Sequence, residues 1–241
     1  MLNPWKDIWA IVERELRHDR FYVIANVIFM IYLGVIMGTI IDSAQGTQFK
    51  WAPLGNYLML TVVPMTGLFF SRRNFNYIKE DSYTQMLRYY RTLAIPLNTI
   101  MWGRLTQLAV AMFINNLFLY TACYGFIRMM GDSLLAADTM VAFALTWLGC
   151  GLLINGMFIY YEFLTSGKVY FWVTLLIMLV LALVVVILNV WRINLLEITL
   201  DFSLRYGLLS PLLWGTLLVG GIGLSLLSMI TRRKMGMRDL A

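Results

Sequence analysis

Six long runs without a charged residue dominate the pattern of hydrophobic and polar positions along this chain of 241 residues. They cover residues 21–41, 51–71, 105–127, 139–161, 169–191 and 206–231. Each run exceeds the ~20 residues that an α-helix needs to cross ~30 Å of hydrocarbon. The pattern therefore predicts an all-α integral membrane protein with six transmembrane helices, organised as a single domain over residues 1–241.

The segment before the first run has the periodicity of an amphipathic helix. Asn3 is a favourable N-cap and Pro4 suits the first helical position, so we expect a helix over residues 4–19. Charged residues occupy its other faces, and its apolar residues recur at helical spacing: Trp5, Ile8, Trp9, Val12 and Leu16. This pattern is typical of a helix that lies in the membrane interface, in contact with lipid, with its tryptophans at headgroup depth.

A second amphipathic stretch lies between the second and third runs. Ser82 and Gln85 match a capping box, and Pro96 disfavours helical geometry at the residue before it, so we predict a short helix over about residues 82–95. Two arginines, Arg88 and Arg91, point away from its apolar face, which consists of Tyr83, Met86, Leu87 and Tyr90. Two interpretations are open: a helix resting on the lipid surface, or a helix that docks in a groove of a soluble partner.

The charged residues add an orientation. If both termini lie on one side, that side holds all but four of the 19 Lys and Arg residues, the exceptions being Lys50, Arg128, Arg192 and Arg205. The positive-inside rule then predicts a multi-pass protein of a bacterial inner or plasma membrane with both termini in the cytoplasm. The net charge of +6 reflects this topology and attraction to anionic lipid, so we infer no nucleic-acid partner.

Residues that could support chemistry inside the runs are few. Cys123 and Cys150 lie within predicted spans and His18 is the only histidine, so we expect no metal site and no Ser-His-Asp catalysis. The runs contain no acidic residue, which disfavours an ion-coupled carrier. Four asparagines are expected to form hydrogen bonds between helices: Asn26, Asn115, Asn116 and Asn155.

Four other positions carry expectations about local structure. Arg104 and Glu162, at the inner ends of the third and fourth spans, are each expected to reach interfacial water. Pro64 is expected to kink the second span. The alternation of apolar and polar residues over 198–204 indicates a strand-like or shallow interfacial segment.

The order of these elements, together with the loop EDSYTQMLRYYRTLAIPLNTIMWGRL at residues 80–105, resembles the permease subunits of ABC-2 type ATP-binding-cassette transporters. In that family the loop contains an acidic residue, a Leu-Pro-Ile turn and a basic residue that opens the third span. This chain has Leu-Ala-Ile-Pro at the turn, and the corresponding residues are Asp81, Leu93, Ile95, Pro96 and Arg104. The run LLSPLLW at 208–214 is also similar to the family's sequence ahead of the last span.

The resemblance implies that residues 82–95 form a coupling helix on the cytoplasmic side and that residues 4–19 form a connecting helix. The coupling helix would dock on a separate ABC ATPase subunit through Tyr83, Met86, Leu87, Arg88, Tyr90 and Arg91. The chain has no G-x-x-x-x-G-K-[ST] motif, so ATP and Mg would bind to the partner ATPase. A second copy or a similar permease would complete the transporter.

The implied activity is ATP-driven export of a hydrophobic or amphipathic substrate, such as a drug, peptide or lipid-like molecule, by alternating access. No residue is assigned to the substrate, and none to catalysis. The alternatives are a membrane scaffold or regulatory subunit without transport, and a membrane enzyme outside this family.

Overall fold

The computed structural model describes residues 4–44, 52–69, 71, 77–93, 95–130 and 135–238. Within these ranges the chain is almost wholly helical and contains no strand. In the same ranges five helices are long and apolar enough to cross a membrane: α2 (Arg20–Ala44), α6 (Leu97–Met130), α7 (Ala137–Leu164), α8 (Gly167–Val190) and α10 (Pro211–Met237). The all-α membrane character is therefore as predicted, and five of the six predicted spans correspond to such helices.

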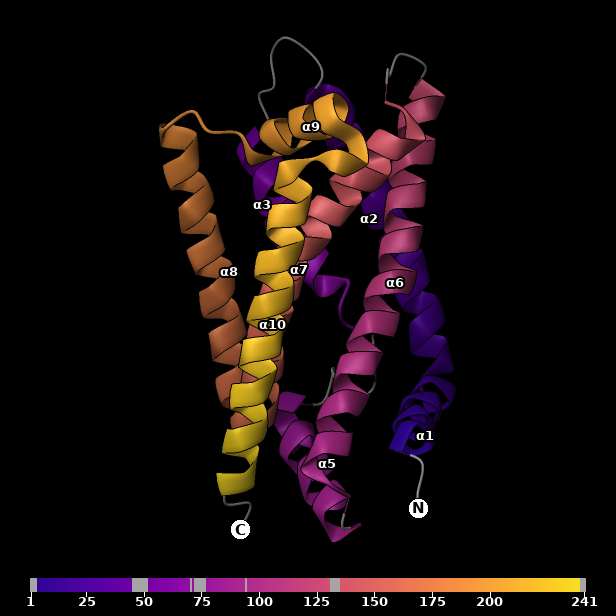
Figure 1. Cartoon of the computed structure of the whole chain (residues 1–241), viewed down its shortest axis with the longest axis vertical. Helices are drawn as coiled ribbons and strands as arrows, with labels where there is room; N and C mark the ends of the chain where they lie inside the picture. Colours follow the sequence, from indigo (N-terminus) through magenta and orange to yellow (C-terminus); the bar gives the residue numbers. More distant parts are fainter. Residues whose placement is uncertain are drawn as a thin grey trace.

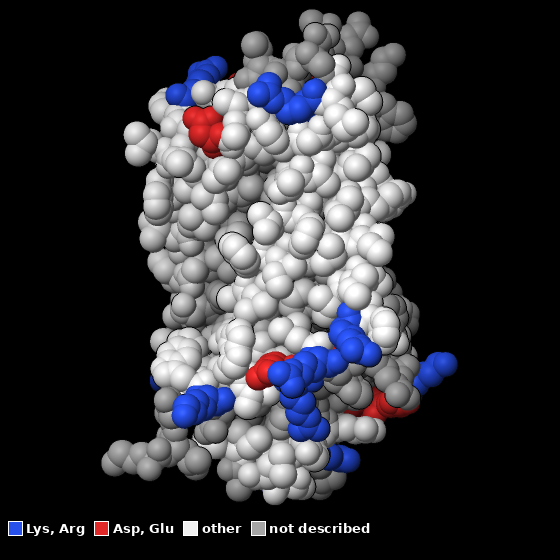
Figure 2. All heavy atoms as spheres, turned by 90° about the vertical axis from the view of Figure 1, so that its right-hand side faces the viewer, with Lys and Arg blue, Asp and Glu red and all other residues white. Residues whose placement is uncertain are grey.

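The helices form an elongated bundle, and both chain termini lie at the same end of it (Figure 1). This N/C end also holds α1 (Pro4–His18) and α5 (Ser82–Thr92), whereas α9 (Leu195–Tyr206) lies across the opposite, distal end. Figure 2 shows a broad band without charged side chains between the two ends, where the charged side chains gather. Such a band suits contact with lipid hydrocarbon, in which unpaired charges are costly.

The predicted span 51–71 differs most from expectation. The helix α3 (Ala52–Met65) has only 14 residues, and at 1.5 Å per residue it is about 21 Å long, shorter than the hydrocarbon layer. It ends one residue after Pro64, and a turn follows at Thr66 and Gly67. The expectation of a kink was therefore wrong: Pro64 lies in the last turn of a helix that stops part-way through the bundle.

The distal connection between α8 and α10 also differs from expectation. Residues Leu195–Tyr206 form the helix α9, not a strand, and the short 3-10 helix η1 (Gly207–Leu209) separates it from α10. The Asn194 side chain caps α9 by accepting hydrogen bonds from the amides of Leu196 and Glu197. Leu196 and Leu200, four residues apart, are buried by helical periodicity. The strand-like alternative was therefore wrong, whereas a shallow interfacial position of this segment stays a prediction.

Close contact between α7 and α10 forms the central pair of the bundle. A Cβ atom added to Gly149 would collide with the backbone of Thr216 and Leu217, and one added to Gly220 would collide with the Gly149 carbonyl. Small residues at such crossings let two helix backbones approach closely in a membrane. Gly149 and Gly220 therefore allow the tight packing of α7 against α10.

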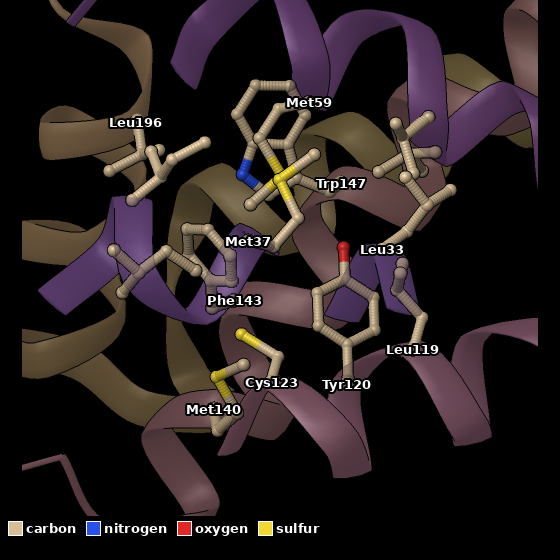
Figure 3. Close-up of a cluster of buried hydrophobic side chains, with 14 of the residues drawn as sticks. Leu33, Met37, Met59, Leu119, Tyr120, Cys123, Met140, Phe143, Trp147 and Leu196 are labelled. Atoms are coloured by element: carbon tan, nitrogen blue, oxygen red, sulfur yellow. The ribbon is translucent and has the colours of Figure 1, made fainter. Parts of the chain in front are cut away.

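Two clusters of buried apolar side chains fill the bundle. The first joins α2, α3, α6, α7 and α9 toward the distal end, around the rings of Trp147 and Phe143 (Figure 3). The second lies at the N/C end and joins α5 to α6, α7 and α10 through Leu87, Ile100, Phe163 and Met235. The second cluster positions α5. Along α6, Asn115 and Asn116 lie between the residues of the second cluster and those of the first.

Candidate functional site

The helix α5 begins at Ser82 and ends at Thr92, so the predicted start and the predicted stop before Pro96 are confirmed. The N-cap is Asp81, which has a positive φ of 46°. Its carboxylate accepts a hydrogen bond of 2.7 Å from the amide of Gly167, the first residue of α8. The Gln85 side chain donates to the Glu80 carbonyl at 2.6 Å, and the N-cap is Asp81, so the predicted capping box of Ser82 and Gln85 was wrong. The Asp81 contact joins the N-terminal ends of α5 and α8.

The apolar face of α5 is buried within the chain. Tyr83, Leu87 and Tyr90 are 5%, 0% and 8% exposed, and Met86 is half-buried. Leu87 and Tyr90 belong to the second cluster. The chain itself therefore covers Tyr83, Leu87 and Tyr90, and these three side chains leave little surface for the predicted contact with a partner. Amphipathic spacing identifies a buried face, but the covering element here is the chain itself.

Three tyrosine rings connect α5 to α8. The ring of Tyr83 lies with its centroid 5.6 Å from that of Tyr77 and 5.3 Å from that of Tyr170, and the Tyr77 and Tyr170 centroids are 5.4 Å apart. Aromatic pairs at such distances stabilise beyond simple burial. Burial raises the pKa of the Tyr83 phenol well above its ordinary value, and the negative charge of Glu162 raises it further.

A buried ion pair lies beside this tyrosine group. The Arg104 guanidinium on α6 donates from Nε at 3.0 Å and from Nη2 at 2.9 Å to Oε2 of Glu162 on α7, and Nε lies 3.1 Å from Oε1. The two side chains are only 11% and 4% exposed. The expectation that each would reach interfacial water was wrong, because each charge neutralises the other in a bidentate contact.

The C-terminal end of α10 fixes α5 from a second side. Arg238 donates to the Phe163 carbonyl at 2.6 Å and to the Thr84 hydroxyl at 2.9 Å, so it links α10 to the end of α7 and to α5. Arg91 on α5 donates to the Met235 carbonyl at 2.6 Å. Cations at a helix C-terminus satisfy carbonyl groups that have no partner within the helix. Arg91 is therefore half-buried in a structural contact.

The outward face of α5 consists of other residues. Its exposed positions, continued by the following Leu93, are Gln85, Arg88, Tyr89, Thr92 and Leu93. Of the six residues predicted to dock on a partner, only Arg88 belongs to this set. The Arg14 guanidinium of α1 lies 5.6 Å from the centroid of the Tyr89 ring, which joins α1 to the edge of this face.

The predicted N-terminal helix is confirmed as α1, but its apolar residues have two environments. Ile8 and Val12 are 5% and 1% exposed, and α1 packs mainly against α6. Trp5 and Trp9 are exposed, and the Trp5 ring centroid is 6.4 Å from that of Trp102 on α6. Leu16 is half-buried. Contact of the two tryptophans with lipid headgroups stays a prediction.

Two asparagines satisfy backbone carbonyls where α3 ends, and two more bond side chains beside them. Asn115 donates to the Thr66 and Leu68 carbonyls at 2.8 and 3.0 Å, and Asn155 donates to the Pro64 carbonyl at 3.0 Å. Asn26 in turn donates to Asn115 at 2.6 Å, and Asn116 donates to the Thr66 hydroxyl at 2.9 Å. The predicted hydrogen bonds between helices are confirmed, and they permit a helix end at membrane depth.

Sequence reasoning missed the Arg104–Glu162 pair, although a signal was present. The two charges flank the same ends of two consecutive predicted spans, and consecutive spans are antiparallel, so their inner ends are neighbours. The contacts of Asp81 with Gly167 and of Arg238 with Thr84 had no such signal, because 86 and 154 residues separate the partners.

No protein-family profile matches the chain, and neither a curated protein nor a solved structure matches it. Among the described residues no group of three His, Cys, Asp or Glu side chains is placed to bind a metal ion. The main feature of the structure at the N/C end is the short helix α5, which contacts the ends of α6, α7, α8 and α10.

Proposed function

We propose that this chain is the membrane-spanning permease subunit of an ATP-driven transporter of the ABC-2 type. The observation that carries the proposal is the position of α5. Its inner face contacts α6, α7, α8 and α10, and its outer face is exposed at the N/C end. A displacement of α5 would therefore act on all four long helices together, as a coupling helix must.

The proposed docking surface is the outer face of α5, with Arg88 and Tyr89 at its centre. An exposed aromatic side chain flanked by an arginine is the composition typical of residues that dominate binding at protein interfaces. Tyr83, Leu87 and Tyr90 transmit force inward and do not touch the ATPase. The sequence resemblance and the position of α5 both support this helix as the coupling helix. They differ in the residues that would contact the ATPase.

In the proposed topology the chain passes through a bacterial inner or plasma membrane six times, the second time through α3 and the segment after it. Both termini lie in the cytoplasm, as the distribution of Lys and Arg predicts. ATP and Mg bind to the partner ATPase, and a second permease copy completes the assembly. Nucleotide-driven movement of α5 then shifts the bundle between inward-open and outward-open forms, which exports a hydrophobic or amphipathic substrate.

Co-purification in detergent tests this proposal. The tagged chain is expressed together with the genes that neighbour its own, and any bound ATPase is measured by mass and by ATP hydrolysis. Arg88→Glu reverses a charge on the outer face of α5, and Lys168→Glu makes the same change at an exposed position at the start of α8.

We expect wild type and Lys168→Glu to retain the ATPase and Arg88→Glu to lose it. The proposal is contradicted if the folded wild-type chain retains no ATPase, or if both variants bind equally well.

A further inference from the structure

A cavity of about 380 Å³ lies between α6 and α7, in the half of the bundle away from α5. Its walls come from residues 112–124 of α6 and residues 137–148 of α7. None of the lining side chains is charged. Phe113, Leu117 and Val141 line it and are 70%, 54% and 50% exposed, so the cavity opens sideways into the charge-free band.

Two of the lining residues have a buried polar atom without a partner in the described part of the chain: Oδ1 of Asn116 and the hydroxyl of Tyr120. Asn116 is only 8% exposed, and its Oδ1 atom accepts no hydrogen bond from the described part of the chain. A buried carbonyl oxygen without a donor is destabilising, because it has lost its hydrogen bonds to water and gained none in return. Most buried polar groups in proteins are paired, so an unpaired one beside a cavity indicates a missing partner.

The orientation of the Asn116 amide is fixed by its neighbours. Its Nδ2 atom donates to the Met112 carbonyl at 2.7 Å and to the Thr66 hydroxyl oxygen at 2.9 Å. The Thr66 hydroxyl hydrogen is already donated to the Val63 carbonyl at 2.6 Å. Turning the amide over would place its oxygen against acceptors, so Oδ1 remains the atom that needs a donor.

The rest of the wall is apolar except for the exposed Thr121 and the hydroxyl groups of Tyr120 and Tyr124. Tyr120 contributes its ring, and its hydroxyl points toward the middle of the first cluster (Figure 3). The volume lies within the range of about 300–1,000 Å³ found for small-molecule sites. An occupant must therefore be largely apolar and uncharged, and it needs one hydrogen-bond donor.

We propose that the α6–α7 cavity binds an uncharged, largely apolar molecule that enters from the hydrocarbon layer and donates one hydrogen bond to Oδ1 of Asn116. The donor is a hydroxyl or an amide N–H group. The identification of this molecule as a transported substrate rests on the proposed function, whereas its binding does not. Asn116 also donates a hydrogen bond to the Thr66 hydroxyl at the end of α3, so a bound molecule would affect the contact that holds this helix end.

Photolabelling of the purified full chain in detergent micelles tests the site without any ATPase. The probe is a long-chain alcohol that carries a diazirine, and its methyl ether serves as the matched probe that cannot donate. Labelled peptides are identified by mass spectrometry. We expect the alcohol to label residues 112–124 and 137–148 about fivefold more than the ether, the discrimination that one hydrogen bond gives.

Two variants locate the site. Ala144→Phe fills the cavity from a lining position and should abolish the labelling, whereas Ala109→Phe adds the same bulk at an exposed position of α6 outside the lining and should leave it unchanged. Competition on the wild-type chain by unlabelled alcohol and unlabelled ether provides the same test if Ala144→Phe does not fold. Equal labelling or equal competition by alcohol and ether overturns the proposal, as does labelling that Ala144→Phe does not reduce.

Discussion

Two short helices, α3 and α5, are both fixed by side chains far away in the sequence, but the chemistry differs. The end of α3 is satisfied by neutral amides from α6 and α7, and an amide from α2 donates to the one on α6. The helix α5 is fixed by charged groups: Asp81, Arg91 and Arg238. The first contact set lies part-way along the bundle, and the second lies at the N/C end.

The difference follows from the cost of burying each kind of group. An ionised side chain in hydrocarbon is far more costly than an amide, so only neutral partners are suitable where α3 stops. At the N/C end charged side chains lie closer to water, so their desolvation costs less there. Their hydrogen bonds are also stronger than those of neutral groups. We infer that the α3 end is a static contact, whereas the α5 contacts can exchange with water when the helix moves.

The largest expected effect comes from the Arg104–Glu162 pair. Glu162→Leu leaves a buried guanidinium without its partner, which should lower the free energy of unfolding by about 3–5 kcal/mol. Denaturant titration in detergent micelles measures this change. The double variant with Arg104→Leu should recover most of the loss, because neither charge is then buried alone. A double variant as unstable as the single one would show that the pair is not the cause.

The α3 end gives the next effect. Asn115→Leu removes the donors to the Thr66 and Leu68 carbonyls and the acceptor for Asn26. We expect a loss of about 2–3 kcal/mol by the same titration, because buried carbonyl groups lose their donors. Asn189→Leu, at an exposed position near the end of α8, should change stability by less than about 0.5 kcal/mol. If the two variants lost the same stability, the hydrogen bonds of Asn115 could not be the cause of the loss.

A smaller, local effect is expected at α5. Arg238→Gln shortens the side chain that joins α10 to Phe163 and Thr84, so α5 should open more readily while the long helices stay intact. Hydrogen exchange of the amides in 82–92 should accelerate about tenfold, which corresponds to a local loss of about 1.4 kcal/mol. The exposed Arg233→Gln is the control. Uniform acceleration along the whole chain would indicate general destabilisation and would contradict a local role.

The smallest effect concerns pH. Because burial raises the pKa of the Tyr83 phenol above its unfolded value, the phenol's contribution to stability is fully present below a pH of about 10 and is lost as the pH rises further. In the folded chain Tyr83 should therefore not ionise between about pH 9 and 11. The Tyr83→Phe variant and the wild type should gain the same tyrosinate absorbance over this range. A decrease equivalent to one tyrosine would show that Tyr83 ionises like an exposed residue.

The sequence predicts α5 well and α3 poorly for a physical reason. The extent of α5 follows from local signals, such as its apolar periodicity and Pro96 after its end, although the N-cap is Asp81 and not Ser82. The end of α3 depends on Asn115 and Asn155, whose partners lie 47 or more residues away. The absence of charged residues from a run indicates that the segment can lie in hydrocarbon. It does not indicate where within the run a helix ends.

The candidate site divides in the same way. Periodicity correctly grouped Tyr83, Leu87 and Tyr90 on one buried face, but it carries no information about the element that covers them. The exposed residue Tyr89 stood outside the predicted apolar set, because its position does not share the helical spacing of that set. The sequence thus located the helix and left its inward and outward faces to be assigned by the structure.

The most direct test of the central claim is cross-linking from the outer face of α5. A benzoyl-substituted phenylalanine replaces Tyr89, which is 46% exposed, and in a control chain it replaces Tyr206, which is 53% exposed at the distal end. The chains are irradiated in membranes that contain the co-expressed ATPase. We predict a cross-link to a nucleotide-binding subunit from position 89 and none from position 206. The absence of a cross-link from position 89, or equal cross-links from both positions, would contradict α5 as the coupling helix.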